Sequence, residues 1–164
     1  MAERISVPEI EFSLLVGRED LIPELAKWFC QEWDPYYGED GPGDADADLK
    51  ACLNRDTLPI VVVALGPDGA LLGTAALKDQ SVGSELGVGP WLAALLVATD
   101  KRGQGIGTAL VSAIEREAAR LGFSWIYTST DSAEGLLRRR GWEPVGDTHS
   151  MRGPLKIYRS FVGG

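Results

Sequence analysis

Residues 102–108 read Arg-Gly-Gln-Gly-Ile-Gly-Thr and place one cation and three glycines directly before a segment with helical spacing. An apolar run, residues 91–97, precedes them at a short polar interval. The first backbone N–H groups of a helix have no partner inside the helix and lie at its positive end, so they bind anions readily. Glycines let a phosphate approach the backbone because they carry no Cβ. The pattern therefore indicates a site for a phosphate-bearing ligand.

Two common phosphate-binding motifs do not fit this turn. A Walker loop requires Lys followed by Ser or Thr after its second glycine, and a dinucleotide fingerprint requires a third glycine where Thr108 stands. The pattern that remains is Arg/Gln-x-x-Gly-x-Gly/Ala, from Arg102 to Gly107. It resembles the acetyl-coenzyme A loop of the Gcn5-related N-acetyltransferase (GNAT) superfamily.

The resemblance continues downstream of the glycine turn. Residues 124–147 are similar to the family's next segment, which is a strand, a short helix and a Gly-aromatic pair, here Gly141-Trp142. The resemblance implies an α/β fold with a mixed, mostly antiparallel central sheet and helices on both faces, formed as one domain by residues 1–164. It also implies an acetyl-CoA-dependent N-acetyltransferase that moves the acetyl group directly from the thioester to a primary amine.

The same resemblance implies how acetyl-CoA binds as co-substrate. The backbone of the turn would hold the pyrophosphate, and the end of the preceding strand would pair with the pantetheine arm and polarise the thioester carbonyl. The expected cofactor-binding residues are Leu95, Leu96, Val97, Arg102, Gly103, Gln104, Gly105, Ile106, Gly107 and Thr108.

Proton handling is where the sequence departs from its family. Many members place a Tyr four positions before the Gly-aromatic pair, as general acid for the coenzyme A thiolate, and Leu137 stands there in this chain. Because a thiol has an ordinary pKa of about 8.5, such an acid is helpful but not required. Ser132, Tyr127 or a water could donate instead. Glu32 and Glu85 are candidate bases, although an exposed helix or loop carboxylate is the simpler interpretation of each.

Three further features carry weaker hypotheses. Trp33, Tyr36 and Tyr37 could form an aromatic wall for the acceptor or could simply anchor the core. His149 is expected in a late turn near the substrate side, either as a surface or structural histidine or, because its ordinary pKa suits proton transfer, as a catalytic one. An acidic loop, residues 34–48, is either solvated surface or an electrostatic lure for an amine.

The elements that must position these residues follow from hydrophobic periodicity and turn signals. In the first helix the apolar residues Ile22, Leu25, Phe29 and Trp33 fall on one face. The helix after the glycine turn is expected to end at Gly122, and the short helix after it to be capped by Asp131 or Ser132. The expected strands are residues 11–16, 59–65, 70–77, 91–97, 123–130, 142–147 and 155–162; the expected helices begin at 19, 47, 106 and 131.

Composition limits the remaining choices. A chain of 164 residues with 45% hydrophobic and 24% charged residues is expected to form one globular domain, and it lacks an apolar run of membrane-spanning length or a signal-peptide layout. We therefore expect a cytoplasmic protein without a membrane partner. A net charge of −8 argues against nucleic acid, and Cys30 and Cys52 lack metal-ligand spacing. The expected partner is a small-molecule or peptide amine, and a homodimer stays open.

Two alternatives remain at this point. A non-catalytic acyl-CoA-binding or sensor domain stays open because Leu137 supplies no hydroxyl. A partner module could instead dock a basic protein through the acidic loop.

Overall fold

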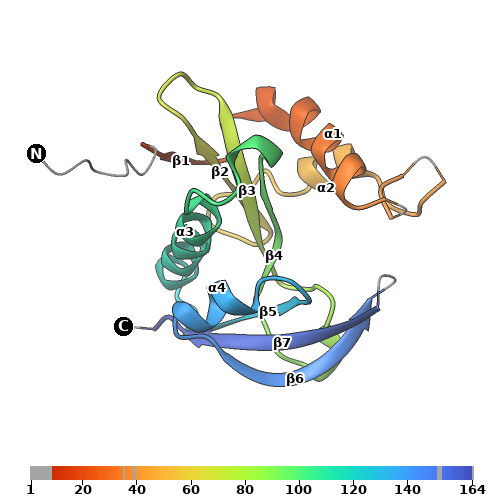
Figure 1. Cartoon of the computed structure of the whole chain (residues 1–164), viewed down its shortest axis with the longest axis vertical. Helices are drawn as coiled ribbons and strands as arrows, with labels where there is room; N and C mark the ends of the chain where they lie inside the picture. The colour runs from red at the N-terminus through yellow and green to blue at the C-terminus, as the bar shows by residue number, and fades with distance from the viewer. Residues whose placement is uncertain (1–8, 35, 39, 151–152, 164) are drawn as a thin grey trace, which may run out of the picture.

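The computed structural model describes residues 9–34, 36–38, 40–150 and 153–163, whose strands form one seven-stranded sheet in the order β1-β2-β3-β4-β5-β7-β6 (Figure 1). Neighbouring strands are antiparallel except β4 and β5, which are parallel. The expectation of a mixed, mostly antiparallel sheet is confirmed. The strands are β1 (Glu11–Leu14), β2 (Ile60–Leu65), β3 (Leu71–Lys78), β4 (Trp91–Val97), β5 (Trp125–Thr130), β6 (Glu143–Ser150) and β7 (Gly153–Phe161).

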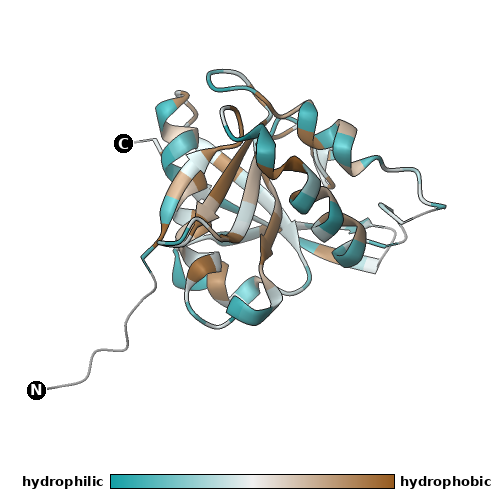
Figure 2. Cartoon of the chain, turned by 90° about the horizontal axis from the view of Figure 1, so that it is seen from above, coloured by the Kyte–Doolittle hydropathy of each residue, from teal (hydrophilic) through white to brown (hydrophobic). Residues whose placement is uncertain are grey.

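Helices cover both faces of the sheet, as expected. The alternation of side chains along β2 shows this directly, because Val62 packs in the cluster that contains α3 and α4, whereas Val61 and Val63 pack in the cluster that contains α1 and α2. The apolar central strands and the polar outer sides of the helices are visible in Figure 2. The helices are α1 (Ile22–Glu32), α2 (Ala45–Lys50), α3 (Ile106–Arg120) and α4 (Glu134–Arg139), with 3-10 turns η1 (Glu19–Leu21), η2 (Ser84–Leu86) and η3 (Thr99–Lys101).

Helix α3 forms as its periodicity predicts. Ile106, Leu110 and Ile114 are each at most 1% exposed and pack on the sheet. The chain leaves the helix through Gly122, whose φ of +92° lies in the left-handed region that glycine adopts without a steric penalty. A 15-residue helix with a buried face is therefore fixed at both ends by glycine.

Helix α4 is attached to α3 by a polar contact. The carboxylate of Glu115 on α3 accepts hydrogen bonds from the guanidinium of Arg140 and from Trp142 Nε1, the latter at 2.9 Å. Trp142 is 3% exposed and belongs to the same core cluster as α3. The Gly-aromatic pair thus fixes the end of α4 to the helix that follows the glycine turn.

Three local predictions are wrong. The second helix is Ala45–Lys50 rather than 47–56, because Asp44 Oδ1 accepts the N–H of Ala47 and starts the helix early. The turn into α4 is held by Thr130 Oγ1, which accepts the N–H groups of residues 132 and 133, and not by Asp131 or Ser132. His149 lies within strand β6 and is exposed, not in a turn.

Candidate functional site

The sheet divides between β4 and β5. Their register consists of one Cα pair, Trp91 with Tyr127, and the Tyr127 N–H donates to the carbonyl of Pro90 at 2.9 Å. One residue further, the hydroxyl of Thr128 donates to the carbonyl of Leu92 at 2.8 Å. At the point where β4 and β5 separate, a side-chain hydrogen bond thus takes the place of the next backbone hydrogen bond between them.

A β-bulge on β4 lies directly beyond this junction. Thr74 of β3 pairs with Leu96 and Ala76 pairs with Ala93, so β4 carries one extra residue in this stretch. Ala94 has a φ of +53°, the one non-glycine residue with positive φ in the part of the chain that the structure describes. Ala93, Ala94 and Leu95 are half-buried and line the gap, although they belong to the apolar run of residues 91–97.

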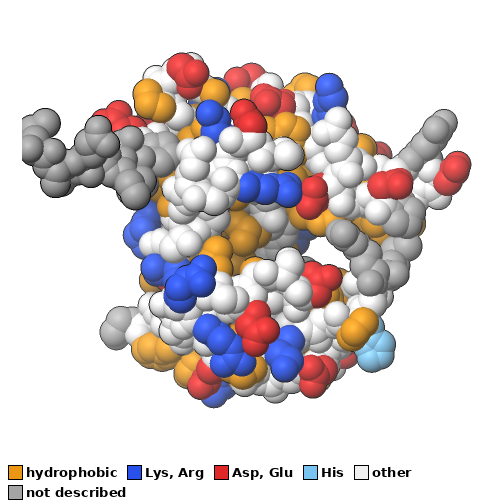
Figure 3. Space-filling model, viewed as in Figure 1, with side chains coloured by type: hydrophobic (Ala, Val, Ile, Leu, Met, Phe, Trp, Pro, Cys, Tyr) orange, Lys and Arg blue, Asp and Glu red, His pale blue; other side chains and the backbone are white. Residues whose placement is uncertain are grey.

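The gap contains a cavity of about 810 Å³, a size typical of small-molecule sites. In the space-filling view it corresponds to the hollow between the part that carries α1 and α2 and the part formed by β5, β6 and β7 (Figure 3). Residues from the C-terminal end of α1, from β3, β4 and β5, and from the turn into α4 line it. They include Trp33, Asp34, Tyr36, Tyr37, Asp48, Lys78, Gln80, Leu92, Ala93, Ala94, Leu95, Thr128, Ser129, Thr130, Asp131, Ser132, Leu137 and Ser150.

One wall of the cavity is aromatic. Trp33, Tyr36 and Tyr37 all line it, and the rings of Tyr36 and Tyr37 meet edge to face with centroids 4.8 Å apart. The hydroxyl of Tyr37 donates to Asp48 Oδ2 at 2.6 Å. Burial, together with this hydrogen bond to a carboxylate, raises the pKa of Tyr37 far above its ordinary value, so the phenol stays protonated. Tyr37 therefore acts here as a hydrogen-bond donor and not as a base.

The glycine turn has the geometry that an anion requires. Gly103 and Gly105 have φ values of +81° and +83°, and no protein atom lies within 4 Å of a Cβ built on either. Gly105 is the N-cap of α3, and within the described part of the chain the first turn of the helix has no side-chain cap. Positive φ at two positions explains why glycine stands at each.

Arg102 links this turn to two other elements. Its Nε donates to the carbonyl of Val97 at 3.2 Å, and its Nη2 lies 3.4 Å from Glu32 Oε2 at the end of α1. Both side chains are about half exposed. Glu32, a sequence candidate for the base, therefore lies beside the glycine turn, and it is not among the residues that line the cavity.

The turn and the cavity adjoin at α4. A Cβ on Gly107 would lie 3.4 Å from Leu136 Cδ1, and the next residue, Leu137, lines the cavity. Leu137 is 1% exposed and packs in the core. The glycine turn and the cavity therefore lie on either side of neighbouring residues of α4.

The other catalytic candidates lie in different places. Ser132 lines the cavity. Tyr127 is outside the cavity lining, and its ring lies 5.7 Å from that of the buried Trp91. Glu85 accepts the hydroxyl of Thr148 at 2.7 Å, and this hydrogen bond lowers the pKa of its carboxyl group. The structure thus brings Ser132 into the cavity and leaves Tyr127, Glu85 and Glu32 outside it.

Sequence reasoning missed two features of the cavity. Lys78 is the last residue of β3, and Ala94 forms the bulge. Lys78 could have been found from the sequence, because a lysine directly after an apolar strand stands out. The bulge could not, because it lies within a uniformly apolar run. Within the described residues no group of three or more His, Cys, Asp and Glu could hold a metal ion, and no helix has the length and apolarity to cross a membrane.

The comparisons with known proteins agree with this architecture. The sequence model of the acetyltransferase (GNAT) family matches residues 22–142, and the chain belongs to this family. Mycothiol acetyltransferase of Catenulispora acidiphila is 34% identical over 116 residues, which are 69% of this chain and 34% of that protein. A second mycothiol acetyltransferase, of Nocardiopsis dassonvillei, is 38% identical over 63 residues, 38% of this chain and 19% of that protein.

The chain spans 19% to 46% of the length of three such curated relatives. Among solved structures, an aminoglycoside 6'-N-acetyltransferase complexed with coenzyme A aligns with a TM-score of 0.74 at 20% identity, covering 95% of this chain and 98% of that one. The corresponding enzyme of Enterococcus faecium aligns with a TM-score of 0.73 at 20% identity, over 94% and 98%. At this identity the likeness shows the fold.

Proposed function

We propose that the chain transfers the acetyl group of acetyl-CoA to a primary amine held in the cleft between β4 and β5. The observation that carries this proposal is the position of the cleft, which opens where β4 and β5 separate and adjoins the glycine turn through α4. The amine nitrogen attacks the thioester carbonyl carbon, the C–S bond breaks, and the amide and coenzyme A leave. The proton lost from nitrogen is taken up by a base or water, and the thiolate takes one from solvent or a donor.

The residues of the turn fit the pyrophosphate of acetyl-CoA. The left-handed glycines and the uncapped start of α3 offer consecutive N–H donors, and Arg102 adds a positive charge. The pantetheine arm would then run along the exposed edge of β4. On this proposal the cofactor contacts come from the ten residues expected from the sequence, Leu95 to Val97 and Arg102 to Thr108.

The bulge at Ala94 fits polarisation of the thioester carbonyl. It exposes the backbone of half-buried residues of β4 to the cavity, away from the ladder with β5. An N–H aimed at a developing oxyanion is worth about 3 kcal/mol in acyl transfer. This contribution depends on backbone geometry, so the small apolar side chains at this position do not argue against catalysis.

No side-chain acid is required by the proposed mechanism. Leu137 stands where many relatives carry a Tyr, and Ser132 is the sequence candidate for a donor that lines the cavity. For the base, the carboxylates that line the cavity are Asp34, Asp48 and Asp131, and water can reach it as well. Glu32 and Glu85 stay predictions for this role.

Release of free thiol from acetyl-CoA against a panel of primary amines tests the proposal, with mass spectrometry of the acetylated amine. We expect turnover with at least one class of amine. Binding of acetyl-CoA without thiol release for any amine would favour a sensor domain. The absence of a hydroxyl at Leu137 is the observation that supports this alternative. The homodimer, the absence of nucleic-acid partners and the cytoplasmic location stay predictions.

A further inference from the structure

Lys78 is the one Lys or Arg among the described residues that line the cavity. It is the last residue of β3 and is opposite Trp91 in the register with β4. The side chain is half-buried, and within the described part of the chain no ion pair, hydrogen bond or ring contact involves it. A cation placed in a partly apolar cavity without a protein counter-charge is costly unless something else neutralises it.

The nearby carboxylate forms no ion pair with Lys78 among the described residues. Asp48 lines the same cavity, and its Oδ2 accepts the hydroxyl of Tyr37. Both charges lie near Cys52: burial raises the pKa of that thiol, the Lys78 charge opposes the rise, and the Asp48 charge adds to it. Lys78 and Asp48 thus both lie near Cys52 without forming an ion pair. The cavity therefore carries a positive and a negative charge that are separate from each other.

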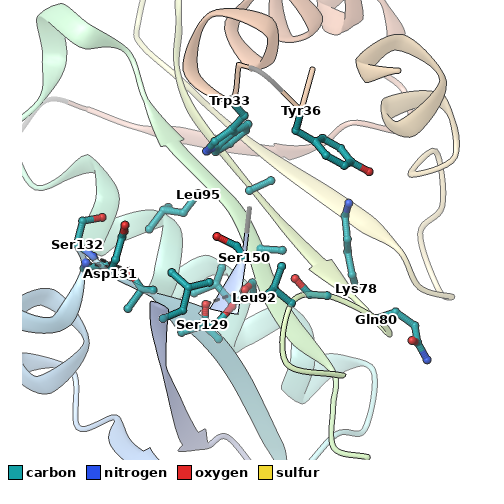
Figure 4. A pocket seen from close by; sticks show the side chains of 18 of the residues that line it. Trp33, Tyr36, Lys78, Gln80, Leu92, Leu95, Ser129, Asp131, Ser132 and Ser150 are labelled. Carbon is teal, nitrogen blue, oxygen red and sulfur yellow. Dashed lines mark hydrogen bonds between the residues drawn. The ribbon is translucent and has the colours of Figure 1, made fainter. Parts of the chain in front are cut away.

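Lys78 lies where it could bind the end of an acceptor molecule that is opposite the reacting amine. In Figure 4, Lys78 extends from β3 toward Tyr36, on the opposite side of the cavity from Ser132 and Asp131 at the start of α4. Lys78 is opposite Trp91, and the bulge at Ala94 lies three residues further along β4, a span of at most roughly 10 Å in a strand. An amine near the bulge therefore leaves space for a carbon skeleton whose other end reaches Lys78.

We propose that Lys78 binds a carboxylate of the acceptor, so that the substrates are primary amines that also carry a carboxylate, such as free amino acids. This inference rests on the proposed function. The aromatic wall supplies apolar surface for the carbon skeleton, and the carboxylate of Asp131, on the opposite side of the cavity from Lys78, favours the ammonium end (Figure 4). A polyamine with cations at both ends would instead bring one of them against Lys78.

The experiment compares matched acceptors on matched proteins. The acceptors are α-amino acids and the series glycine, β-alanine, 4-aminobutyrate and 6-aminohexanoate, each beside its amide, which keeps the amine and loses the charge. The proteins are wild type, Lys78→Met, Lys78→Glu and the control Lys27→Met. Lys27 is an exposed lysine of α1 that does not line the cavity.

We expect the best acid to exceed its amide in kcat/KM by roughly 10- to 100-fold, the range for a hydrogen bond to a charged group. Lys78→Met should abolish that preference, Lys78→Glu should reverse it, and Lys27→Met should keep it. Equal rates for acids and amides in wild type, or an unchanged preference in Lys78→Met, would overturn the assignment of Lys78 as the carboxylate-binding residue. The proposed acetyl transfer would not be affected by either result.

A binding measurement separates this proposal from the proposed function. N-acetyl amino acids keep the carboxylate and have no amine to react, so calorimetry on the coenzyme A complex reports the carboxylate site alone. We expect tighter binding of the N-acetyl acid than of its amide, with the difference lost in Lys78→Met. Such binding without turnover of any amine would overturn the transferase and support the site. Turnover with no acid preference in either assay would overturn the site and keep the transferase.

Discussion

The Thr128 hydroxyl donates a 2.8 Å hydrogen bond to the carbonyl oxygen of Leu92 at the last point where β4 and β5 are joined. Thr128 is 7% exposed, and the two strands make one Cα register pair next to it. This contact satisfies a buried carbonyl that the separating strand leaves without a ladder partner. It therefore fixes where the cleft begins.

Thr128→Val removes the hydroxyl and keeps the branched shape. The unpaired carbonyl should cost about 1–3 kcal/mol of unfolding free energy, and kcat/KM should fall because the edge of the cleft shifts. Denaturant unfolding and steady-state kinetics measure the two effects.

Thr74→Val is the matched control for that change. The Thr74 hydroxyl donates to the carbonyl of Val62 at 3.0 Å in an equally buried site outside the cavity lining. It should lose similar stability with unchanged kcat/KM, and Thr128→Ser should restore activity. Equal kinetic losses in both valine variants would reduce Thr128 to a purely structural role.

Gly107→Ala should raise stability and keep acetyl-CoA binding, whereas Gly105→Val should weaken binding. Gly107 is helical, and its Cβ would meet Leu136 at an ordinary 3.4 Å, so alanine, which the motif admits here, fits and should stabilise α3 by up to about 1 kcal/mol. Valine at Gly105 places a branched side chain in the open turn, so affinity measured by calorimetry should fall more than about tenfold, a loss of at least about 1.4 kcal/mol.

Gly135→Ala is the control for Gly107→Ala. It changes the second residue of α4, where the added Cβ would meet the flexible end of Arg139, and Gly135 does not line the cavity. Its acetyl-CoA affinity should match wild type. Unchanged affinity in a folded Gly105→Val protein would remove the glycine turn from the cofactor site.

Glu32→Gln should strengthen acetyl-CoA binding modestly and leave kcat unchanged. It releases Arg102 from an exposed ion pair worth at most about 1 kcal/mol, so the affinity gain should not exceed about fivefold. Arg102→Met should weaken binding and increase KM for acetyl-CoA. A fall in kcat of more than about 100-fold in Glu32→Gln would instead make Glu32 the base, within the range for general catalysis.

Ser132→Ala and Tyr127→Phe test the acid-free mechanism. We expect both to retain kcat within about tenfold, since a positioned acid would contribute about 10²- to 10⁴-fold. Leu137→Tyr should raise kcat if the short helix places the hydroxyl at the thiolate. Because Leu137 is 1% exposed, overpacking could cost about 1–3 kcal/mol, so its melting temperature is measured alongside. A loss above 100-fold in Ser132→Ala would identify a substitute acid.

Glu85→Gln should leave the pH profile of kcat/KM unchanged near neutrality. The Thr148 hydrogen bond lowers the pKa of Glu85, which makes this carboxylate a weaker base. The same shift stabilises the fold above the ordinary Glu pKa of about 4.3 and is lost as pH falls through the lowered value. The stability difference between Glu85→Gln and wild type should therefore vanish in acid. If Glu85→Gln lost the decrease in kcat/KM that wild type shows at low pH, Glu85 would again be a candidate base.

The sequence alone determined the local structure and the phosphate-binding pattern. Apolar spacing predicted the buried faces of α1 and α3, and Gly122 was predicted to end α3, because both depend on residues close together in the chain. The sequence-based prediction was wrong where several polar side chains could cap the same helix, because Thr130 and not Asp131 or Ser132 accepts the N–H groups before α4.

Only the tertiary structure decided what the cavity contains. Asp48, Lys78 and Thr128 come from three distant segments, and Glu85 and Tyr127 are excluded from the cavity by the same packing. The bulge at Ala94 arises from a register shift against β3 within a run of small and apolar residues, which carries no local signal. Strand pairing and side-chain burial are set by contacts across the whole sheet, so spacing along the chain could not assign them.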